Sequence, residues 1–483
     1  MNITLTAKIR NSKVRDFQEL EMAIYRIALE VGRQLMQNAL EKLDGELLET
    51  RDVQRYRSKG FQKTCIKTMM GPVEYRRRVY VDNAAAESCR CVHLLDEVLG
   101  IEKIGLMSPG VCQLAAASVC ETTYRRTAEF ISGATGQDVS HQAVWNIVQR
   151  IGISEEAQVK RHKELAKRHR GAGALLTKIL YEENDGIWLN LQGRSRKEYG
   201  PSKEMKVGIA YDGVLWENTK SGQRRTLDSK VAYAGFEKAD EFRQNKEGLV
   251  ASRYAVDKIQ LRVMNGDGAN WIRTRNSPQN IDVLDTFHRN KKITECVHDP
   301  EFADLLRTLL WNGEIDRLLE CLDAYVNSVM DPAEIESAKE LLRYYTENKD
   351  SLLGYYERNI PIPETRRPGI IHHARLGSME SNIFTLIGNR MKGRRACWSV
   401  EGANHLALLL CMRHTVGFED LFADLPEIPF EAPDPQETRP VLGAGSVPEK
   451  EGRGYEWQCR MTAENASGWL KDFMKHISHR NNF

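Results

Sequence analysis

The chain has 483 residues, 41% of them hydrophobic, with 69 Lys and Arg against 67 Asp and Glu. This composition excludes global disorder and allows several domains, while a net charge of +2 neither favours nor excludes a nucleic-acid partner. Ten scattered cysteines, no apolar leader and no apolar run of about 18 residues predict a reduced, cytoplasmic protein without a membrane span.

The first 105 residues predict a helix followed by a hairpin. Apolar residues recur with a period near 3.6 over residues 15–50, which is typical of an amphipathic helix. Residues 63–83 alternate around Met70-Gly71-Pro72, which indicates a small hairpin. We treat residues 1–105 as an N-terminal helical and hairpin region.

Residues 106–172 predict a helical region with a helix-turn-helix pattern. Residues 120–152 indicate a helix, a glycine-containing turn and a second helix capped by Ser140. Its expected buried stripe is Val144, Ile147, Val148 and Ile151. The side chains expected to be free for DNA bases are His141, Gln142, Asn146 and Gln149. An ordinary helical hairpin is the alternative, and the basic segment 160–170 either binds phosphates or is a solvated helix.

Residues 173–300 predict the strands of a mixed α/β or α+β core. Five short apolar or alternating runs end in turn residues, at 175–193, 204–214, 229–236, 259–272 and 280–293, and the last runs into a helix. Residues 301–360 are helical throughout, with Asp331-Pro332 starting one helix, and form a predicted all-helical insertion. Residues 361–416 return to the core, and 417–483 form an acidic linker and a tail.

Three acids stand out as candidates for chemistry. Asp185 lies at the start of the first strand run, Asp267 follows the fourth between Gly266 and Gly268, and Glu380 lies in a predicted helix. Carboxylates converging from rigid elements suit a pair of Mg²⁺ or Mn²⁺ ions about 4 Å apart that act on a phosphodiester.

The surroundings of these acids allow a functional and a structural interpretation. The two glycines would leave room for metal and DNA, and Trp271 would pack behind Asp267 or stack on DNA. Spacing places Glu380 on one helix face with Phe384, Ile387 and Met391. Asp185 and Asp267 also suit ordinary turns, and Glu380 suits a helix N-terminus, so structural roles stay open.

Three stretches of the chain carry a family resemblance. "NDGIWLNLQG" at 184–193, "GDGANWI" at 266–272 and "GSMESNIFTLIGNRMKGRRACWSVEGANHL" at 377–406 resemble DDE transposases of bacterial insertion sequences, in particular the ISLre group, which is distantly similar to Mutator-type transposases. The resemblance covers residues 56–415. It implies an RNase H-like catalytic core with a helical insertion before the last acid, and an N-terminal DNA-binding region.

The resemblance also assigns residues. The implied catalytic and metal-binding triad is Asp185, Asp267 and Glu380, with Glu401 as the rival third acid. Asp285 and His288 match a D-x-x-H element, for which a supporting or DNA-contacting role is expected; a capped strand end is the alternative for His288.

A basic cluster surrounds Glu380, the single acid between residues 366 and 395. The seven bases of this cluster are Arg366, Arg367, Arg375, Arg390, Lys392, Arg394 and Arg395. Because phosphate neutralisation supplies most non-specific DNA affinity, the cluster predicts a DNA path, although a solvated basic face is the alternative.

These observations predict a transposase that binds the ends of its own insertion sequence and catalyses metal-dependent strand cleavage and strand transfer. Its expected partners are double-stranded DNA at element ends and target, and further copies of itself in a homodimer or larger assembly. The alternatives are a non-catalytic DNA-binding protein derived from a transposase and a structure-specific nuclease with an RNase H fold.

Overall fold

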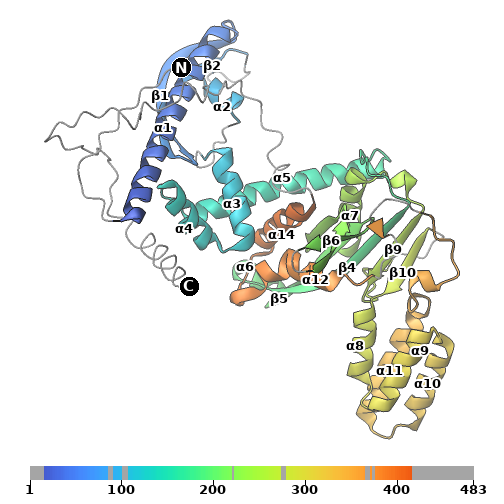
Figure 1. The fold of residues 1–483 in the computed structure, drawn as a ribbon. Helices are drawn as coiled ribbons and strands as arrows, with labels where there is room; N and C mark the ends of the chain where they lie inside the picture. The colour runs from blue at the N-terminus through green and yellow to red at the C-terminus, as the bar shows by residue number, and fades with distance from the viewer. Residues whose placement is uncertain are drawn as a thin grey trace. The chain divides into compact units, whose positions relative to one another are not determined.

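The computed structural model describes residues 16–84, 91–100, 107–219, 222–273, 279–364, 370–371 and 376–415 (Figure 1). The chain divides into two compact units. The described residues up to Ile147 belong to the first unit, and those from Val148 onward belong to the second. The predicted acidic linker and tail at 417–483 and the bases Arg366, Arg367 and Arg375 lie outside the described residues.

The first unit begins with a long helix against a long hairpin, as predicted. Its elements are α1 (Phe17–Thr50), β1 (Tyr56–Thr68), β2 (Gly71–Asp82), β3 (Cys91–Val92) and α2 (Leu94–Val98). Asp16 caps α1 by accepting a hydrogen bond from the Glu19 amide at 2.8 Å. Their shared core is Leu40, Ile66, Val73, Tyr75 and Leu95. The hairpin is longer than predicted, with antiparallel pairing from Tyr56↔Asp82 to Thr68↔Gly71.

The predicted helix-turn-helix pattern forms as α4 and α5, preceded by α3. The three helices are α3 (Pro109–Glu121), α4 (Tyr124–Thr135) and α5 (His141–Lys167). Gly136 ends α4 in the left-handed region at φ 66°, where a glycine is free of the Cβ clash. Ser140 caps α5 through its hydroxyl, which accepts from the Ala143 amide at 3.1 Å. Val144, Ile147 and Val148 are buried as expected.

The second unit is built on a mixed five-stranded sheet, which agrees with the predicted mixed α/β class. Its strands are β4 (Ile179–Asn190), β5 (Ser202–Tyr211), β8 (Val231–Gly235), β9 (Leu261–Gly266) and β10 (Asn280–Leu284). Their order is β10-β9-β4-β5-β8; β5 is antiparallel to both of its neighbours, whereas β9 is parallel to β4 and β10. The first strand in sequence is therefore central.

Alternation along β4 sends its side chains to opposite faces of the sheet. Glu182 and Asn184 face α7 (Ala239–Arg253), where Lys246 Nζ lies 2.6 Å from Glu182 and donates to Asn184 at 2.9 Å. Glu183 and Asp185 face the other side, where α12 (Met379–Ile383) contacts β4. The last helix, α14 (Val400–Thr415), packs against β8.

A second small sheet was not predicted from sequence. It consists of β6 (Gly213–Thr219) and β7 (Gly222–Asp228) as an antiparallel hairpin, with β11 (Ile370–Ile371) added to β6. Further short elements of this unit include α6 (Gly193–Tyr199), a π-helical turn (Phe384–Gly388) and α13 (Asn389–Met391).

The predicted helical segment after the strands is present and has its own core. It consists of α8 (Thr286–Cys296), α9 (Pro300–Asn312), α10 (Ile315–Ser328) and α11 (Pro332–Glu347). Leu306, Leu318, Leu322 and Leu341 are among its fully buried residues. Asp331 caps α11 with Pro332 at its first turn, as predicted. Of the helices in the described ranges, none combines the length and the apolarity needed to cross a bilayer.

Candidate active site

Asp185 in β4 and Asp267, directly after β9, lie at matching positions relative to the parallel pairing of these two strands. The ladder between β4 and β9 ends with Glu183 opposite Asn265, and each aspartate lies two residues further along its own strand direction. Asp185 is thus in the middle of β4 and not at its start, because β4 continues to pair with β5 beyond the end of β9. The register brings the two predicted acids to the same end of the β4–β9 ladder, the carboxyl end.

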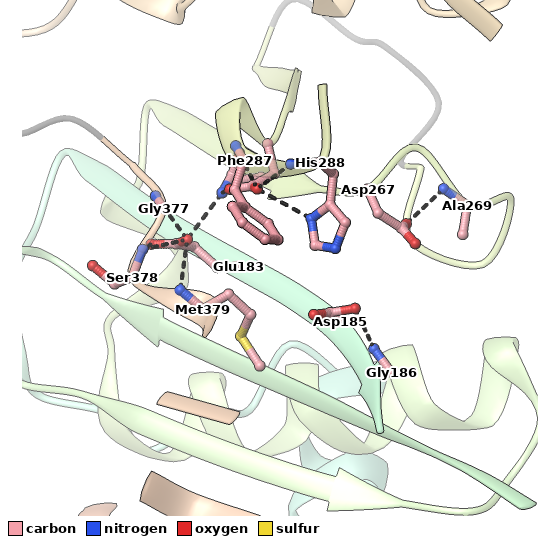
Figure 2. A network of polar contacts seen from close by, with 12 residues as sticks. Glu183, Asp185, Gly186, Asp267, Ala269, Phe287, His288, Gly377, Ser378 and Met379 are labelled. Carbon is pink, nitrogen blue, oxygen red and sulfur yellow. Dashed lines mark hydrogen bonds and ion pairs between the residues drawn. The ribbon is translucent and has the colours of Figure 1, made fainter. Parts of the chain in front are cut away.

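Each aspartate is held by a local backbone hydrogen bond (Figure 2). Asp185 accepts from the Gly186 amide at 2.7 Å, and Asp267 accepts from the Ala269 amide at 2.8 Å. The carbonyl of Asp267 also accepts from the Tyr344 hydroxyl at 2.6 Å, so α11 fixes the loop that carries this aspartate.

The two glycines beside Asp267 also have structural reasons of their own. A Cβ on Gly266 would lie 2.4 Å from Ile272 Cγ2, and Gly268 has φ +86°, which disfavours any other residue. They therefore permit tight packing and a left-handed turn. Trp271 packs behind the loop, edge-on to Phe242 with ring centroids 5.5 Å apart.

Glu380 reaches the same cavity from α12, but the predicted face around it is wrong. Glu380 is exposed and Phe384 is 62% exposed, whereas Ile387 and Met391 are fully buried. The π-helical turn at Phe384–Gly388 adds residues to one turn and rotates everything after it, so an α-helical period fails across it.

One open cavity of about 220 Å³ gathers the candidate residues. Its lining residues are Asn184, Asp185, Asn265, Gly266, Asp267, Asp285, His288, Met379 and Glu380. Glu401, the rival third acid, starts α14 and is not part of this lining. The structure therefore places Glu380 beside the two aspartates.

His288 and Asp285 form a pair at the start of α8. Asp285 caps the helix by accepting from the amides of Phe287 and His288, at 3.0 and 3.1 Å. The same Oδ2 atom lies 3.1 Å from His288 Nδ1, which leaves the Nε2 atom of the ring free to meet a ligand in the cavity.

Burial, hydrogen bonds and neighbouring charges shift the pKa values of three residues in the site. Burial raises the pKa of Asp185 to about 6, and the charges of Asp267 and Glu380 add to the rise against the Gly186 hydrogen bond and His288. The hydrogen bond to Asp285 raises the pKa of His288, helped by the charges of Asp185 and Asp267. Burial opposes ionisation of Asp285, but hydrogen bonds from His288 and Asn265 outweigh it and lower the pKa of Asp285. The cavity thus favours bound positive charge.

The residues that line the cavity offer the oxygen ligands that a hard divalent cation prefers, but their spacing does not enclose such an ion. Four carboxylates line the cavity, those of the three candidate acids and of Asp285, and oxygen ligands are what Mg²⁺ and Mn²⁺ prefer. Within the described ranges, however, no three His, Cys, Asp or Glu side chains stand close enough together to enclose a metal ion. The carboxylates are coupled electrostatically but do not form a closed coordination shell.

Sequence reasoning missed Glu183, the fully buried acid that organises this site (Figure 2). Its carboxylate accepts from the Tyr211 hydroxyl at 2.6 Å and from the amides of Gly377, Ser378 and Met379 at 2.9–3.2 Å. Asn265 Nδ2 donates both to Glu183 at 2.9 Å and to Asp285 at 3.1 Å. One polar chain therefore links the start of α12 to His288.

A signal for Glu183 does exist in the sequence. "EEND" at 182–185 interrupts an otherwise apolar strand, and four consecutive polar residues cannot all face solvent when side chains alternate. At least two of them had to be buried and partnered.

Some of the basic residues that were predicted to contact DNA lie in the described part of the chain. Lys392 and Arg395 are exposed, and the Arg390 guanidinium lies 5.4 Å from the centroid of the Trp398 ring. The side chain of Arg394, like all of Arg375, lies outside the described part of the chain.

The predicted base-contacting residues of α5 divide into exposed and buried ones. His141 and Gln142 are exposed, and Asn146 accepts a hydrogen bond from Gln142 at 3.0 Å. Gln149 was expected to be exposed, which is wrong: it is 7% exposed and its Oε1 lies 2.6 Å from His405 Nδ1 of α14.

Comparisons with known proteins give relatives of uncharacterised activity. A UPF0236 protein of Caldanaerobacter subterraneus subsp. tengcongensis is 24% identical over 82% of this chain and 78% of its own. The UPF0236 protein in the vanSb 3′ region of Streptococcus gallolyticus is 22% identical over 84% of each.

A solved structure and a family model complete the comparisons. The crystal structure of the Mos1 strand transfer complex aligns at 12% identity over 50% of this chain and 77% of its own, with a TM-score of 0.13, which does not establish a shared fold. The model of the uncharacterised protein family UPF0236 matches residues 10–418. Because this match spans most of the sequence, the chain belongs to the uncharacterised protein family UPF0236.

Proposed function

We propose that this protein is a DDE transposase of the ISLre group that binds the ends of its own insertion sequence and cleaves and joins DNA there. One observation carries the proposal: Asp185, Asp267 and Glu380, which are far apart in sequence, line one cavity together with His288. Acids brought to one cavity by two strands and a helix suit metal-dependent phosphoryl transfer.

The proposed organisation follows the sequence resemblance. Residues 173–300 and 361–416 form an RNase H-like core, 301–360 are its helical insertion, and 106–172 are a helix-turn-helix DNA-binding region after the N-terminal region 1–105. The mixed sheet with its parallel strands β10, β9 and β4 and the helical core after β10 support this organisation.

Asp185, Asp267 and Glu380 would hold Mg²⁺ or Mn²⁺. When bound, these ions neutralise charge on the phosphodiester and assist the attacking and leaving oxygens. The repulsion that helps to raise the pKa of Asp185 supports such a cation site, because an ion there would relieve it.

The protein's own groups have distinct roles in the proposal. His288 holds a proton on Nδ1 toward Asp285, and its Nε2 donates to a phosphate oxygen in the cavity. Glu183 fixes the helix that carries Glu380, and Asn265 keeps Asp285 in place. Lys392 and Arg395 are exposed and available to the DNA backbone.

The proposed reaction is hydrolysis of one strand at the element end, which frees a 3′-hydroxyl, followed by attack of that hydroxyl on target DNA. The substrate is double-stranded DNA. Because two ends must be joined at one place, we propose that the protein acts as a homodimer or a larger assembly.

The test uses a plasmid that carries this protein's own coding sequence with its natural flanks. We expect nicking and joining at the flanks in the presence of Mg²⁺, and we expect Asp267→Asn to bind the flanking DNA but leave it uncut. Normal strand transfer by Asp267→Asn would falsify the assignment.

The same assay separates the alternatives. Wild-type protein that binds the flanks without ever cutting them would be a non-catalytic DNA-binding derivative. Wild-type protein that cuts branched DNA but never joins ends would be a structure-specific nuclease.

A further inference from the structure

The β1–β2 hairpin has one packed face and one open face. Directly opposed residues of an antiparallel pair share a face. Ile66 and Val73 are opposed, and both are buried against Leu40 of α1. Lys63 is opposed to Arg76, Cys65 to Glu74 and Phe61 to Arg78. These three pairs define what we call the outer ribbon face.

The central pair of the outer ribbon face brings together two positive charges. Lys63 and Arg76 are both exposed, and in the described part of the chain neither makes an ion pair. Like charges directly opposite one another weaken a hairpin. A fold that carries such a pair at its surface gains when an external anion neutralises both members.

In the described part of the chain the acids of the neighbouring helices make no ion pair with Lys63 or Arg76; Glu41 of α1 accepts only from the Arg76 backbone amide, at 3.1 Å. Asp96 of α2 pairs with Arg77, and Asp44 of α1 pairs with Arg78 at 2.6 Å. The acid of the outer ribbon face is Glu74, opposite Cys65 and nearer the hairpin turn. Along β1 in the other direction, Arg57 and Lys59 are exposed beside the bulge at Ser58/Gly60 and add two more bases.

An aromatic ring lies among these charges. Phe61 is 56% exposed, and the guanidinium carbons of Arg76 and Arg78 lie 5.4 and 4.5 Å from its ring centroid. Because Arg78 is already paired with Asp44, Arg76 is the arginine beside this ring that a ligand can use. Its position along the ring reduces the entropy that it loses on binding. The face therefore offers an ordered cation beside an apolar centre.

We infer that the outer ribbon face binds duplex DNA, with Lys63 and Arg76 on phosphates and Phe61 in contact with the groove. The inference rests on the proposed function, because it names a second surface through which the same protein holds DNA. A two-stranded ribbon fits the major groove, which is about 12 Å wide. Thirteen residues of β1 span about 40 Å at about 3.3 Å each, longer than one turn of duplex.

The position of Glu74 determines which half of the ribbon can contact DNA. Glu74 would repel phosphate near the turn, where Lys67 Nζ already donates to the Asp138 carbonyl at 2.5 Å and Gln137 donates to the Thr68 carbonyl at 2.9 Å. The turn end is thus anchored to the protein, and the half of the ribbon that carries Arg57, Lys59 and Lys63 is left for DNA.

The experiment measures binding of the full-length chain to a non-specific DNA duplex across a salt series. In Lys63→Ala/Arg76→Ala we expect several-fold weaker binding and a slope of log K against log salt that is smaller by about 2, since two phosphate contacts are lost at about 0.9 each. Arg26→Ala/Lys42→Ala removes the same charge from exposed positions of α1 and should leave affinity and slope nearly unchanged. Glu74→Gln should bind more tightly than the wild type.

Cys65 supplies an independent readout on the unmodified protein. It is exposed on the outer ribbon face, two residues from Lys63, so duplex bound at Lys63 should slow its alkylation, which mass spectrometry follows. Unchanged affinity and slope in Lys63→Ala/Arg76→Ala, or equal loss in the α1 control, would overturn the ribbon inference while duplex binding by the wild type keeps the proposed function standing. Wild-type protein that binds no duplex at all would overturn both.

Discussion

The carboxylate of Glu183 accepts hydrogen bonds from the amides of Ser378 and Met379 at 2.9 and 3.2 Å, so the central strand β4 holds the first residues of α12 directly. The bonds join positions almost two hundred residues apart and place Glu380 at the cavity. A buried anion at the start of a helix is satisfied by amides that have no intrahelical partner. Placement of the third acid thus depends on an acid outside the proposed triad.

This relationship predicts that a substitution at Glu183 mainly lowers stability, whereas one at Glu380 mainly lowers activity. Glu183→Gln leaves one amide NH₂ facing backbone donors, so we expect the free energy of unfolding to fall by about 2–4 kcal/mol in denaturant titration. Glu380→Gln is the matched control, because its side chain is exposed and its stability should change by no more than about 0.5 kcal/mol.

DNA cleavage activity should rank these two variants in the opposite order from their stability. Glu380→Gln should lose DNA cleavage although it folds normally, and Glu183→Gln should retain part of it at low temperature where it remains folded. Equal stability of the two variants would contradict the role given to Glu183.

Metal binding can be followed without catalysis. If Asp185, Asp267 and Glu380 hold Mg²⁺ or Mn²⁺, saturating metal should stabilise the second unit by about 1–3 kcal/mol and raise its Tm by about 2 °C or more. Asp267→Asn should reduce this shift strongly, whereas Glu401→Gln, at an exposed acid away from the cavity, should keep it. The measurement is thermal unfolding with and without metal, with Ca²⁺ as a further comparison; a full shift in Asp267→Asn would count against the site.

A buried acid predicts how stability depends on pH. Burial raises the pKa of Glu155 in α5 to about 7, against 4.5 as its ordinary value. A raised pKa means that the native state prefers the protonated form, so this stabilisation is complete below about pH 4.5 and is lost as pH rises through about 7.

The loss is at most about 3–4 kcal/mol, because each tenfold difference in proton affinity between the native and unfolded states is worth about 1.4 kcal/mol. Glu155→Gln should remove this part of the pH profile and be more stable than the wild type above pH 7. Denaturant titrations at pH 5 and pH 8 measure it. Parallel profiles for the two proteins would show that Glu155 does not titrate as its burial implies.

Features set by residues close together in sequence could be predicted, whereas features set by contacts between distant segments could not. The strands of the five-stranded sheet and the α4–α5 turn followed from local alternation and capping, so they could be predicted. The face of Glu380 could not, because the π-helical turn at Phe384–Gly388 breaks the period on which the prediction rested. Gln149 looked exposed because its partner His405 lies 256 positions away in sequence. Periodicity reports neighbours in sequence, whereas these outcomes are set by packing between distant segments.

Two helical glycines provide the last prediction, because their surroundings differ completely. A Cβ on Gly152 of α5 would lie 2.3 Å from His405 Cβ and 2.4 Å from its Cγ, and His405 is 2% exposed and bonded to Gln149, so it cannot turn aside. A Cβ on Gly45 of α1 would meet nothing within 4 Å. In an open helix interior, alanine is more favourable than glycine by about 0.5–1 kcal/mol.

Gly45→Ala should therefore stabilise the protein by about that amount, whereas Gly152→Ala should destabilise it by about 1–3 kcal/mol through overpacking between α5 and α14. Differential scanning calorimetry of both variants gives the answer. The result separates the intrinsic helix preference of alanine from the cost of a clash, since the two substitutions are chemically identical. If Gly152→Ala proved as stable as Gly45→Ala, the contact between α5 and α14 would have to be looser than the buried Gln149–His405 pair indicates.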